Sequence, residues 1–452
     1  MRSNRSSFTG KIGFVLAAAG SAVGLGNIWR FPYLAAKYGG GIFLLVYIVL
    51  SVTFGFALMV AEIAIGRKTQ LSAISAYGSL DKRFSFVGVL GALVPVIILP
   101  YYSVIGGWVM KYMVGFAAGH TSQMAEDSYF GNYLGLTWEP VLWFLLFIGI
   151  TAVVVMLGVE KGVEKVSKVM MPILIGLILV IVIYTLVTMD GAWDGVVYYL
   201  KPDFSKFSMM TVVAAMGQLF YSMSLAMGIM ITFGSYIKKD ISIEKSVKQI
   251  EIFDTGVAFL AGLMIIPAVF AFSGGNEEAL GQGPGLMFVT LPKIFEAMPG
   301  GAFIGAAFFV MVLFAALTSS ISLMETVVSI FMDKLKWGRK LSTLAVLGTS
   351  LVLGLCSSLG YSVWAEVRII GMQLLDFFDF FSNSLLMPVV ALATAIFVGY
   401  VLRPKAVIEE VELSGPFKHK KLFTVVIRYV APVCILIILI SSVLTAFGVL
   451  EI

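Results

Sequence analysis

Long apolar runs recur along the whole chain and are separated by short polar stretches. About 20 mostly apolar residues are enough to cross the hydrocarbon core of a bilayer as a helix, whereas the strands of a membrane barrel alternate apolar and polar positions. The pattern therefore predicts an all-α integral membrane protein with eleven transmembrane helices. The predicted spans are 11–36, 41–66, 85–115, 139–158, 166–189, 208–237, 245–272, 301–332, 341–358, 369–402 and 422–447.

Composition agrees with a membrane protein and excludes other classes. Only 13% of the 452 residues are charged and the mean hydropathy is +0.98, whereas soluble domains contain about 25% charged residues. The net charge of +5 is spread over short loops, so we expect no nucleic-acid partner. Cys356 and Cys434 lie in apolar runs and His120 and His419 in predicted loops. This arrangement argues against a disulfide, a histidine metal site or an enzyme.

Basic residues predict the orientation in the membrane. With a cytoplasmic N-terminus, 23 of the 31 Lys and Arg residues lie on the inner side and only Lys201, Lys206, Lys293 and Arg368 in outer loops. Cytoplasmic loops carry an excess of Lys and Arg. We therefore expect a multi-pass protein of the cell inner (plasma) membrane, and eleven spans would place the C-terminus outside.

The first span contains a segment, residues 20–32, that is poorly suited to a membrane helix. Its three glycines each weaken a helix by about 1 kcal/mol relative to Ala, and Asn27 and Arg30 are costly at membrane depth. A glycine-rich packing face is one interpretation. An unwound segment that offers carbonyl oxygens to a cation, and a helix N-terminus to a carboxylate, is the other. Asn27, Arg30 and Pro32 favour the unwound segment.

A second interrupted stretch, residues 217–228, lies in the sixth span and is again rich in glycine and serine. Interrupted helices in corresponding positions of two halves are typical of secondary transporters with inverted repeats. The interpretation is two inverted five-helix repeats, 1–189 and 190–402, with broken first and sixth helices. Residues 403–452 would add a cytoplasmic loop and an eleventh helix with an extracellular C-terminus.

The first break also carries a family signature. Its sequence, Gly-Ser-Ala-Val-Gly-Leu-Gly-Asn-Ile-Trp-Arg-Phe-Pro-Tyr at 20–33, closely resembles the first helix of the neurotransmitter:sodium symporters. Further matching motifs occur in order at 39–41, 62–67, 161–165 and 317–320. The resemblance extends from Arg5 to about residue 447 and points to a bacterial amino-acid transporter branch with eleven spans.

The resemblance implies two sodium sites and no organic cofactor. Both consist only of oxygen ligands, which suit a hard cation. The first would use Ala22, Asn27, Ser222 and Asp254, together with the substrate carboxylate. The second would use the carbonyls of Gly20, Val23 and Ala315 and the hydroxyls of Thr318 and Ser319. From residue types alone, hydroxyls at 318–320 are also typical of bonding back to their own helix.

The resemblance further implies a substrate pocket in which Tyr102 would bind the substrate carboxylate and Tyr221 would form a lid. Monoamine carriers of the family have an aspartate at the position of Gly24, so glycine here indicates an amino acid. Ala226 stands where many relatives have glycine. The implied pocket residues are Ser21, Ala22, Gly24, Gly26, Ile98, Tyr102, Tyr221, Ser222, Ser224, Met227, Ser319 and Leu323. Because Ile98, Met227 and Leu323 are apolar and no charge faces them, a neutral, hydrophobic or aromatic side chain is expected.

Asp254 departs from the common family pattern, in which Asn occupies this position. Chloride-dependent members bind chloride beside it, through residues matched here by Tyr47, Gln218 and Ser222. We expect the Asp254 carboxylate to supply the negative charge that chloride supplies elsewhere, so that no chloride is required. The alternative is an Asp at a helix end that faces cytoplasmic water.

Gates are implied on both sides of the pocket. Arg30 would pair with Asp379 on the outer side, and Arg5 with Asp333, near Tyr236, on the inner side. Gly162 and Pro172, ten residues apart on the fifth span, would allow the cytoplasmic half of that helix to unwind. A simple proline kink is the competing explanation.

The resulting hypothesis is sodium-coupled symport of a neutral L-amino acid into the cell by alternating access, without chloride. The partners would be that amino acid, two sodium ions and the lipid bilayer. Coupling to protons through Asp254 or Glu62, or a broad preference for small neutral amino acids, is the nearest alternative. An ion channel is a more distant one, because two breaks that meet at mid-depth favour a closed site over a continuous pore.

Overall fold

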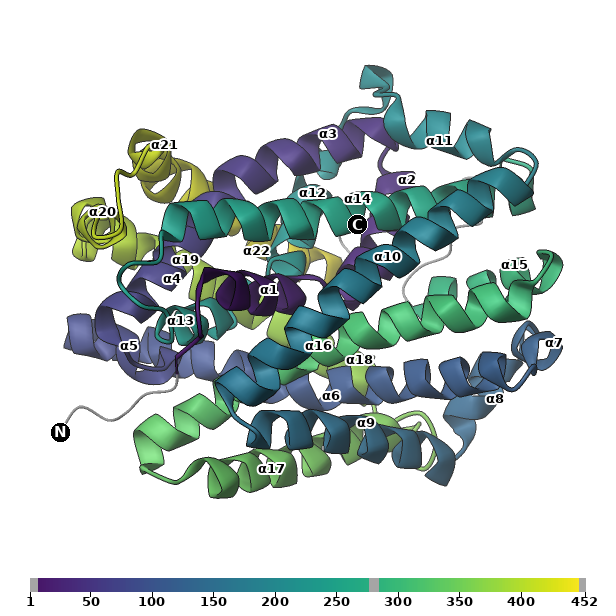
Figure 1. The fold of residues 1–452 in the computed structure, drawn as a ribbon, viewed down its shortest axis with the longest axis horizontal. Helices are drawn as coiled ribbons and strands as arrows, with labels where there is room; N and C mark the ends of the chain where they lie inside the picture. Colours follow the sequence, from purple (N-terminus) through teal and green to yellow (C-terminus); the bar gives the residue numbers. More distant parts are fainter. Residues whose placement is uncertain (1–6, 276–283, 447–452) are drawn as a thin grey trace.

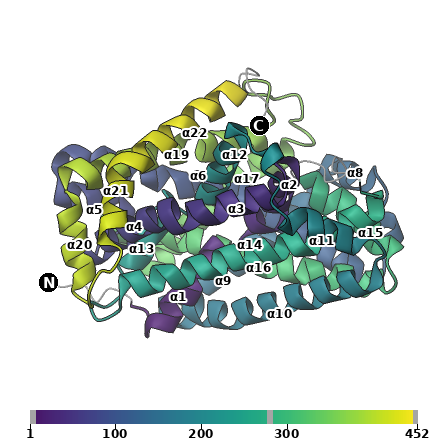
Figure 2. The ribbon, with the colours of Figure 1, turned by 90° about the horizontal axis from the view of Figure 1, so that it is seen from above.

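The computed structural model describes residues 7–275 and 284–446. Within these ranges the secondary structure is helical, apart from two isolated bridges that join Gly40 to Pro202 and Ile369 to Met372. The long helices lie side by side along the longest axis of the molecule (Figure 1), and the view turned by 90° shows the same bundle from above (Figure 2). In the described part of the chain, the predicted helical fold class is therefore confirmed.

Nine helical segments among the described residues are long and apolar enough to cross a membrane, and a bent pair makes ten if it counts as one span. They are Gly41–Thr69 (α3, α4), Lys82–Ala117 (α6), Trp138–Met156 (α9), Val159–Thr188 (α10), Ile243–Ser273 (α14), Gly301–Leu335 (α16), Arg339–Leu359 (α17), Leu374–Val401 (α18, α19) and Lys420–Thr445 (α21, α22). The shorter helices beside them are α5 (Ala73–Leu80), α7 (Thr121–Met124), α8 (Tyr129–Gly135), α11 (Ala192–Leu200), α15 (Leu291–Ala297) and α20 (Pro404–Glu412).

The bent pair is the first span. Helix α1 (Lys11–Ala22) ends before Val23, whose ψ of 101° is extended, and the chain resumes as a π-helical turn (Gly26–Arg30) that leads into α2 (Phe31–Lys37). The two helical directions differ by 56°. Pro32 lies at the start of α2, directly after the π-helical turn. The interruption predicted from the glycines and Asn27 is thus present.

A second interruption separates α12 (Met209–Ser222) from α13 (Ile229–Gly234). Three residues between them have left-handed φ angles: Ser224 at 53°, Ala226 at 59° and Gly228 at 71°. This conformation costs about 1–2 kcal/mol for residues that carry a Cβ. Hydrogen bonds hold it: Ser224 Oγ donates to the Ser21 carbonyl at 2.9 Å, and the Ala226 N–H donates to Glu62 Oε1 at 2.7 Å.

Two predicted boundaries differ from the structure. The loop predicted between 158 and 166 is mostly a π-helical turn (Val159–Glu164) continuous with α10 (Lys165–Thr188), because Gly158 turns the chain in a single left-handed step at a φ of 94°. The span predicted to begin at 369 begins as a helix only at Leu374.

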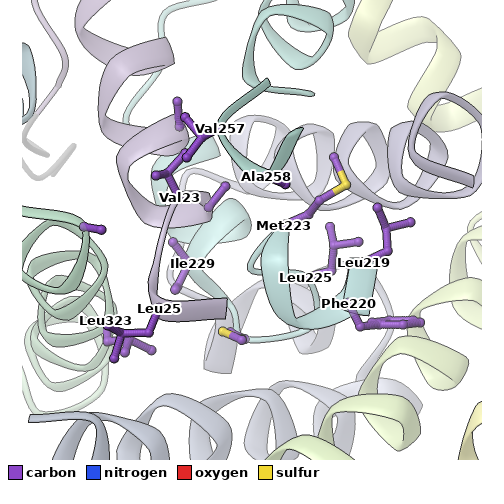
Figure 3. Packing of buried hydrophobic residues seen from close by; sticks show 14 of the residues in the cluster. Val23, Leu25, Leu219, Phe220, Met223, Leu225, Ile229, Val257, Ala258 and Leu323 are labelled. Atoms are coloured by element: carbon purple, nitrogen blue, oxygen red, sulfur yellow. The ribbon is translucent and has the colours of Figure 1, made fainter. Parts of the chain in front are cut away.

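The two interruptions lie inside the bundle. Helix α1 packs against α10, α14 and α16, and α6 (Ser85–Ala117) packs along α16 and α9. Figure 3 shows apolar side chains around the breaks, with Val23 and Leu25 from the first and Met223, Leu225 and Ile229 from the second. This packing holds unwound backbone at membrane depth, which is tolerated only where protein surrounds it or it lines a cavity.

Candidate functional site

The two breaks line one small cavity of about 30 Å³. All twelve residues expected to form the substrate pocket line it, together with Leu25, Asn27 and Ile229. Leu25 and Asn27 belong to the first break. Ile229 is the first residue of α13, and sequence reasoning missed it because its position only becomes apparent once the end of the second break is known.

One end of the cavity is polar and tightly fitted. Ser21 Oγ donates to Ser224 Oγ at 3.2 Å, and the hydroxyl of Tyr102 accepts from the Leu25 N–H at 3.4 Å. A Cβ added at Gly24 would lie 2.8 Å from Ser319 Oγ and 3.2 Å from the Tyr102 hydroxyl. A side chain at position 24 would therefore have to displace Ser319, and the hydroxyl and N–H groups at this end suit a carboxylate.

Apolar side chains form another part of the cavity lining. Ile98, Met227, Ile229 and Leu323 belong to it, and none of the lining residues carries a charged side chain. The Tyr221 ring lies against Gly26, where any Cβ would collide with it. Such a surface suits an uncharged, apolar side chain of the ligand.

Asn27, Ser222 and Asp254, three of the four residues expected at the first sodium site, are in contact, while Ala22 lines the cavity. Asn27 Nδ2 donates to Asp254 Oδ1 at 2.8 Å and to Ser222 Oγ at 2.9 Å, and Ser222 Oγ donates to Asp254 Oδ1 at 2.7 Å. The Asn27 oxygen was expected to face the ion, but it accepts from the Gly24 N–H at 3.1 Å. A half-turn of this amide would direct the oxygen toward Ser222 and Asp254.

The predicted second sodium site contains oxygens from both α1 and α16. Ser319 Oγ lies 3.4 Å from the Gly20 carbonyl oxygen and 3.3 Å from that of Val23, and Thr318 Oγ1 lies 3.1 Å from that of Ala315. The donor set is therefore oxygen only and fits a hard cation. Thr318 also donates to the Phe314 carbonyl at 3.0 Å, so back-bonding to its own helix occurs as well.

Asp254 lies within the group of residues expected to hold chloride in relatives. The Tyr47 hydroxyl donates to Asp254 Oδ2 at 3.3 Å, and Ser222 donates to Oδ1. Gln218 instead donates to the Gly26 carbonyl at 2.9 Å. Asp254 is fully buried, so it does not face cytoplasmic water as the alternative interpretation required.

The outer gate differs from its prediction. Asp379 Oδ1 accepts from Tyr101 at 3.1 Å and from Asn383 at 2.6 Å, while the Arg30 guanidinium lies 5.5 Å from the centre of the Tyr221 ring. Among the described residues, Arg30 and Asp379 form no direct ion pair. The direct pair therefore stays a prediction, and in this conformation hydrogen bonds from Tyr101 and Asn383 hold the carboxylate while the guanidinium lies over the Tyr221 ring.

On the inner side, Arg5 lies outside the described residues. Asp333 Oδ2 accepts from the Ser72 N–H at 2.6 Å, and Tyr236 donates to Glu325 Oε1 at 2.8 Å. Glu325 also forms a two-bond ion pair with Arg339, at 2.6 and 3.0 Å. Sequence reasoning missed Arg339, the first residue of α17, because the sequence around it is polar and basic and resembles any loop.

The predicted unwinding pair flanks the cytoplasmic part of α10. Gly162 lies in the π-helical turn, where a Cβ would collide with the Val154 carbonyl, and Pro172 lies in the helix interior. Pro172 removes one backbone hydrogen bond from the helix.

Comparison with known proteins identifies the family. The sodium:neurotransmitter symporter family matches residues 5–126 and 134–449. The chain belongs to this family. Its members are sodium-dependent transporters and not enzymes, and the chain is accordingly a multi-pass membrane transporter.

Two bacterial relatives match along nearly their whole length. The uncharacterized sodium-dependent transporter YhdH of Bacillus subtilis (strain 168) is 37% identical over 95% of this chain and 96% of its own. An uncharacterized sodium-dependent transporter of Haemophilus influenzae is 32% identical over 97% of this chain and 98% of its own. The crystal structure of MhsT in complex with L-phenylalanine matches with a TM-score of 0.87 and 36% identity, over 97% of this chain and all of that one. The chain therefore has an MhsT-like fold.

Proposed function

We propose that this symporter family member carries a neutral, hydrophobic or aromatic L-amino acid into the cell together with two sodium ions, by alternating access. The observation that carries the proposal is the lining of the cavity between the two breaks. Its polar groups around Gly24 and Tyr102 suit a carboxylate, and the other side chains that line it are apolar and uncharged. MhsT, which shares the fold, has been crystallised with L-phenylalanine.

The proposed ion sites flank this cavity. One would form from Ala22, Asn27, Ser222 and Asp254 after the Asn27 amide turns, and would use the substrate carboxylate as a further ligand. The other would form from the oxygens of Gly20, Val23, Ala315, Thr318 and Ser319. Inward movement of one charge supplies about 2.3 kcal/mol per 100 mV of membrane potential, so two sodium ions would drive strong accumulation.

Chloride independence belongs to the same proposal. Tyr47 and Ser222 donate hydrogen bonds to the Asp254 carboxylate, so two of the groups that would hold an anion already hold a fixed one. A proton at Asp254 in place of the first sodium ion is the second candidate mechanism. The full burial of this carboxylate favours it enough to test, because burial disfavours the charged form of an acid.

The proposed topology has eleven spans in the plasma membrane with a cytoplasmic N-terminus. It counts the nine continuous spans, the bent first span and the interrupted pair α12–α13. Residues 1–189 and 190–402 would form the inverted repeats, and 403–452 the added segment. Arg30, Asp379, Arg5, Asp333 and Tyr236 would act at the gates.

A thermal-shift panel of the twenty amino acids, in sodium and in potassium at equal ionic strength, tests the central proposal. We expect phenylalanine, leucine and similar residues to raise the unfolding temperature in sodium only. Lysine and glutamate should have no effect. Equal shifts in sodium and potassium that grow as the pH falls would favour proton coupling, and no selective shift at all would refute amino-acid transport.

A further inference from the structure

A second, larger cavity of about 680 Å³ lies away from the substrate cavity, between α3–α4, α14 and the start of α21. Most of its wall is apolar, and three of its residues, Ile48, Val52 and Ile252, are 38%, 53% and 71% exposed. In a membrane-spanning bundle, exposed apolar side chains of this kind face lipid. We call this cavity the α3–α14 groove.

One end of the α3–α14 groove holds two basic side chains, and both of them contact the same carboxylate. Lys248 and His419 line it, and both side chains are about 40% exposed. Each contacts Glu244, at 3.3 Å from Lys248 and 2.5 Å from His419. The His419 ring also packs edge-on against Phe56, another wall residue. Basic pockets between transmembrane helices on the cytoplasmic side are typical sites for lipid phosphates.

A carboxylate lies one helical turn further along α14. Glu251 is 5% exposed and lines the groove, and its Oε1 has no hydrogen-bond partner among the described residues. A buried acceptor without a donor costs about 1–3 kcal/mol, and more when it is charged. Residues three apart on a helix lie on the same face, so a positive group at Lys248 and an unsatisfied negative group at Glu251 are neighbours at the same end of an apolar groove.

Charge complementarity decides which lipid fits. A zwitterionic headgroup would place its phosphate at Lys248 and its cation at Glu251. A primary ammonium can donate hydrogen bonds to the carboxylate, whereas a trimethylated ammonium cannot donate any and an anionic glycerol headgroup has no cation. We propose that the α3–α14 groove binds one phospholipid whose headgroup carries a primary ammonium, with an acyl chain along Ile48, Val52 and Ile252.

The chain offers a variant that fills the groove without disturbing the protein. A Cβ added at Gly256, which lines the groove, would meet no heavy atom within 4 Å. Gly256→Leu should therefore extend into the groove, and leucine also favours the helix relative to glycine. Glu251→Gln removes the charge that would bind the ammonium. Glu409→Gln is the matched control, because Glu409 is 61% exposed on α20 and forms an exposed ion pair with Lys405.

Native mass spectrometry of the purified full chain tests the proposal, with added phosphatidylethanolamine, phosphatidylcholine or phosphatidylglycerol of identical acyl chains. The wild type and Glu409→Gln should retain one phosphatidylethanolamine at least tenfold more strongly than either other lipid. Glu251→Gln should lose the preference over phosphatidylcholine, and Gly256→Leu should lose the retained lipid.

Three results would each overturn the lipid proposal: equal retention of the three lipids by the wild type, preference for phosphatidylglycerol, or full retention by Gly256→Leu. Sodium-dependent amino-acid binding by Gly256→Leu confirms that this variant is folded and keeps this test separate from that of transport.

Discussion

Asp254 places a fixed carboxylate where Asn27, Ser222 and Tyr47 converge. The hydroxyls of Tyr47 and Ser222 and the amide of Asn27 donate hydrogen bonds to this carboxylate. A bound anion would need the same kind of donors. At the scale of single residues, the charge at this position would therefore determine whether the proposed site needs an added anion.

Asp254→Asn should make uptake chloride-dependent. The amide keeps nearly the same shape but removes the negative charge that offsets the sodium ions, so the vacated donors become available to chloride. In proteoliposomes, uptake by the variant should fall about tenfold when gluconate replaces chloride, because roughly 1.4 kcal/mol of charge stabilisation corresponds to that factor. Wild-type uptake should not change.

Asp203→Asn is the control for this experiment, because Asp203 lies exposed in the loop after α11 and only caps a short turn through Ser205. It should behave like the wild type in both buffers. An Asp254→Asn variant that transports equally well with and without chloride would show that the carboxylate has another role.

At the scale of elements, the two interrupted helices line the candidate site, and Pro172 weakens the hydrogen bonding within α10. Glu62 on α4 stabilises the second break by accepting a hydrogen bond from Ala226, and the hydrogen bond from Ser224 to Ser21 joins the two interrupted helices. Helix α10 packs against α1, and Pro172 leaves one of its carbonyls without a helical donor. Unwinding between Gly162 and Pro172 would therefore loosen the support of the cytoplasmic part of α1.

Pro172→Ala should slow transport while sodium-dependent amino-acid binding remains intact. Alanine restores the missing hydrogen bond and is about 3 kcal/mol more favourable than proline in a helix interior, so α10 resists unwinding. The measurement is the initial uptake rate in proteoliposomes beside the thermal shift produced by phenylalanine. Pro140→Ala is the matched control, since Pro140 lies in the first turn of α9, where no helical hydrogen bond is lost. If Pro172→Ala transports at the wild-type rate, Pro172 only bends α10 and has no role in unwinding it.

At the scale of the whole molecule, a buried ion pair joins segments that are 343 residues apart. Arg67, at the end of α4, is fully buried and donates to Glu410 Oε1 on α20 at 2.8 Å and to the Ile241 carbonyl at 2.8 Å. It also donates to the Glu410 carbonyl. This arginine therefore connects three polypeptide segments on the side of the bundle where α20 lies.

Arg67→Gln should destabilise the protein by about 3–5 kcal/mol, because it leaves a buried carboxylate without its partner. We expect the unfolding temperature in detergent to fall by roughly 5 °C or more. Arg67→Gln with Glu410→Gln should cost less than the sum of the single changes, since no lone charge remains. Arg83→Gln, which removes an exposed ion pair with Asp81, should have no measurable effect. Additive losses in the double variant would mean that the two side chains do not act as a pair.

Much of the fold and of the candidate site could be predicted from local sequence. Apolar runs predict spans because a bilayer demands about 20 apolar residues in a row, and the glycines with Asn27 predict the first break because they are poor in any membrane helix. The resemblance to the family then identified twelve of the fifteen residues that line the cavity. Boundaries such as the turn at Gly158 were less predictable, because one left-handed residue replaced an expected loop.

The sequence by itself determined that this is a helical membrane protein with two interrupted helices, since apolar length and unfavourable residues act locally along the chain. Only the tertiary structure decided which way the Asn27 amide points, that Asp379 is held by Tyr101 and Asn383, and that Arg339 pairs with Glu325. It also brought Lys248, Glu251 and His419 together at one groove. These features depend on which hydrogen-bond donors and charges distant segments bring into contact, and no local pattern contains that information.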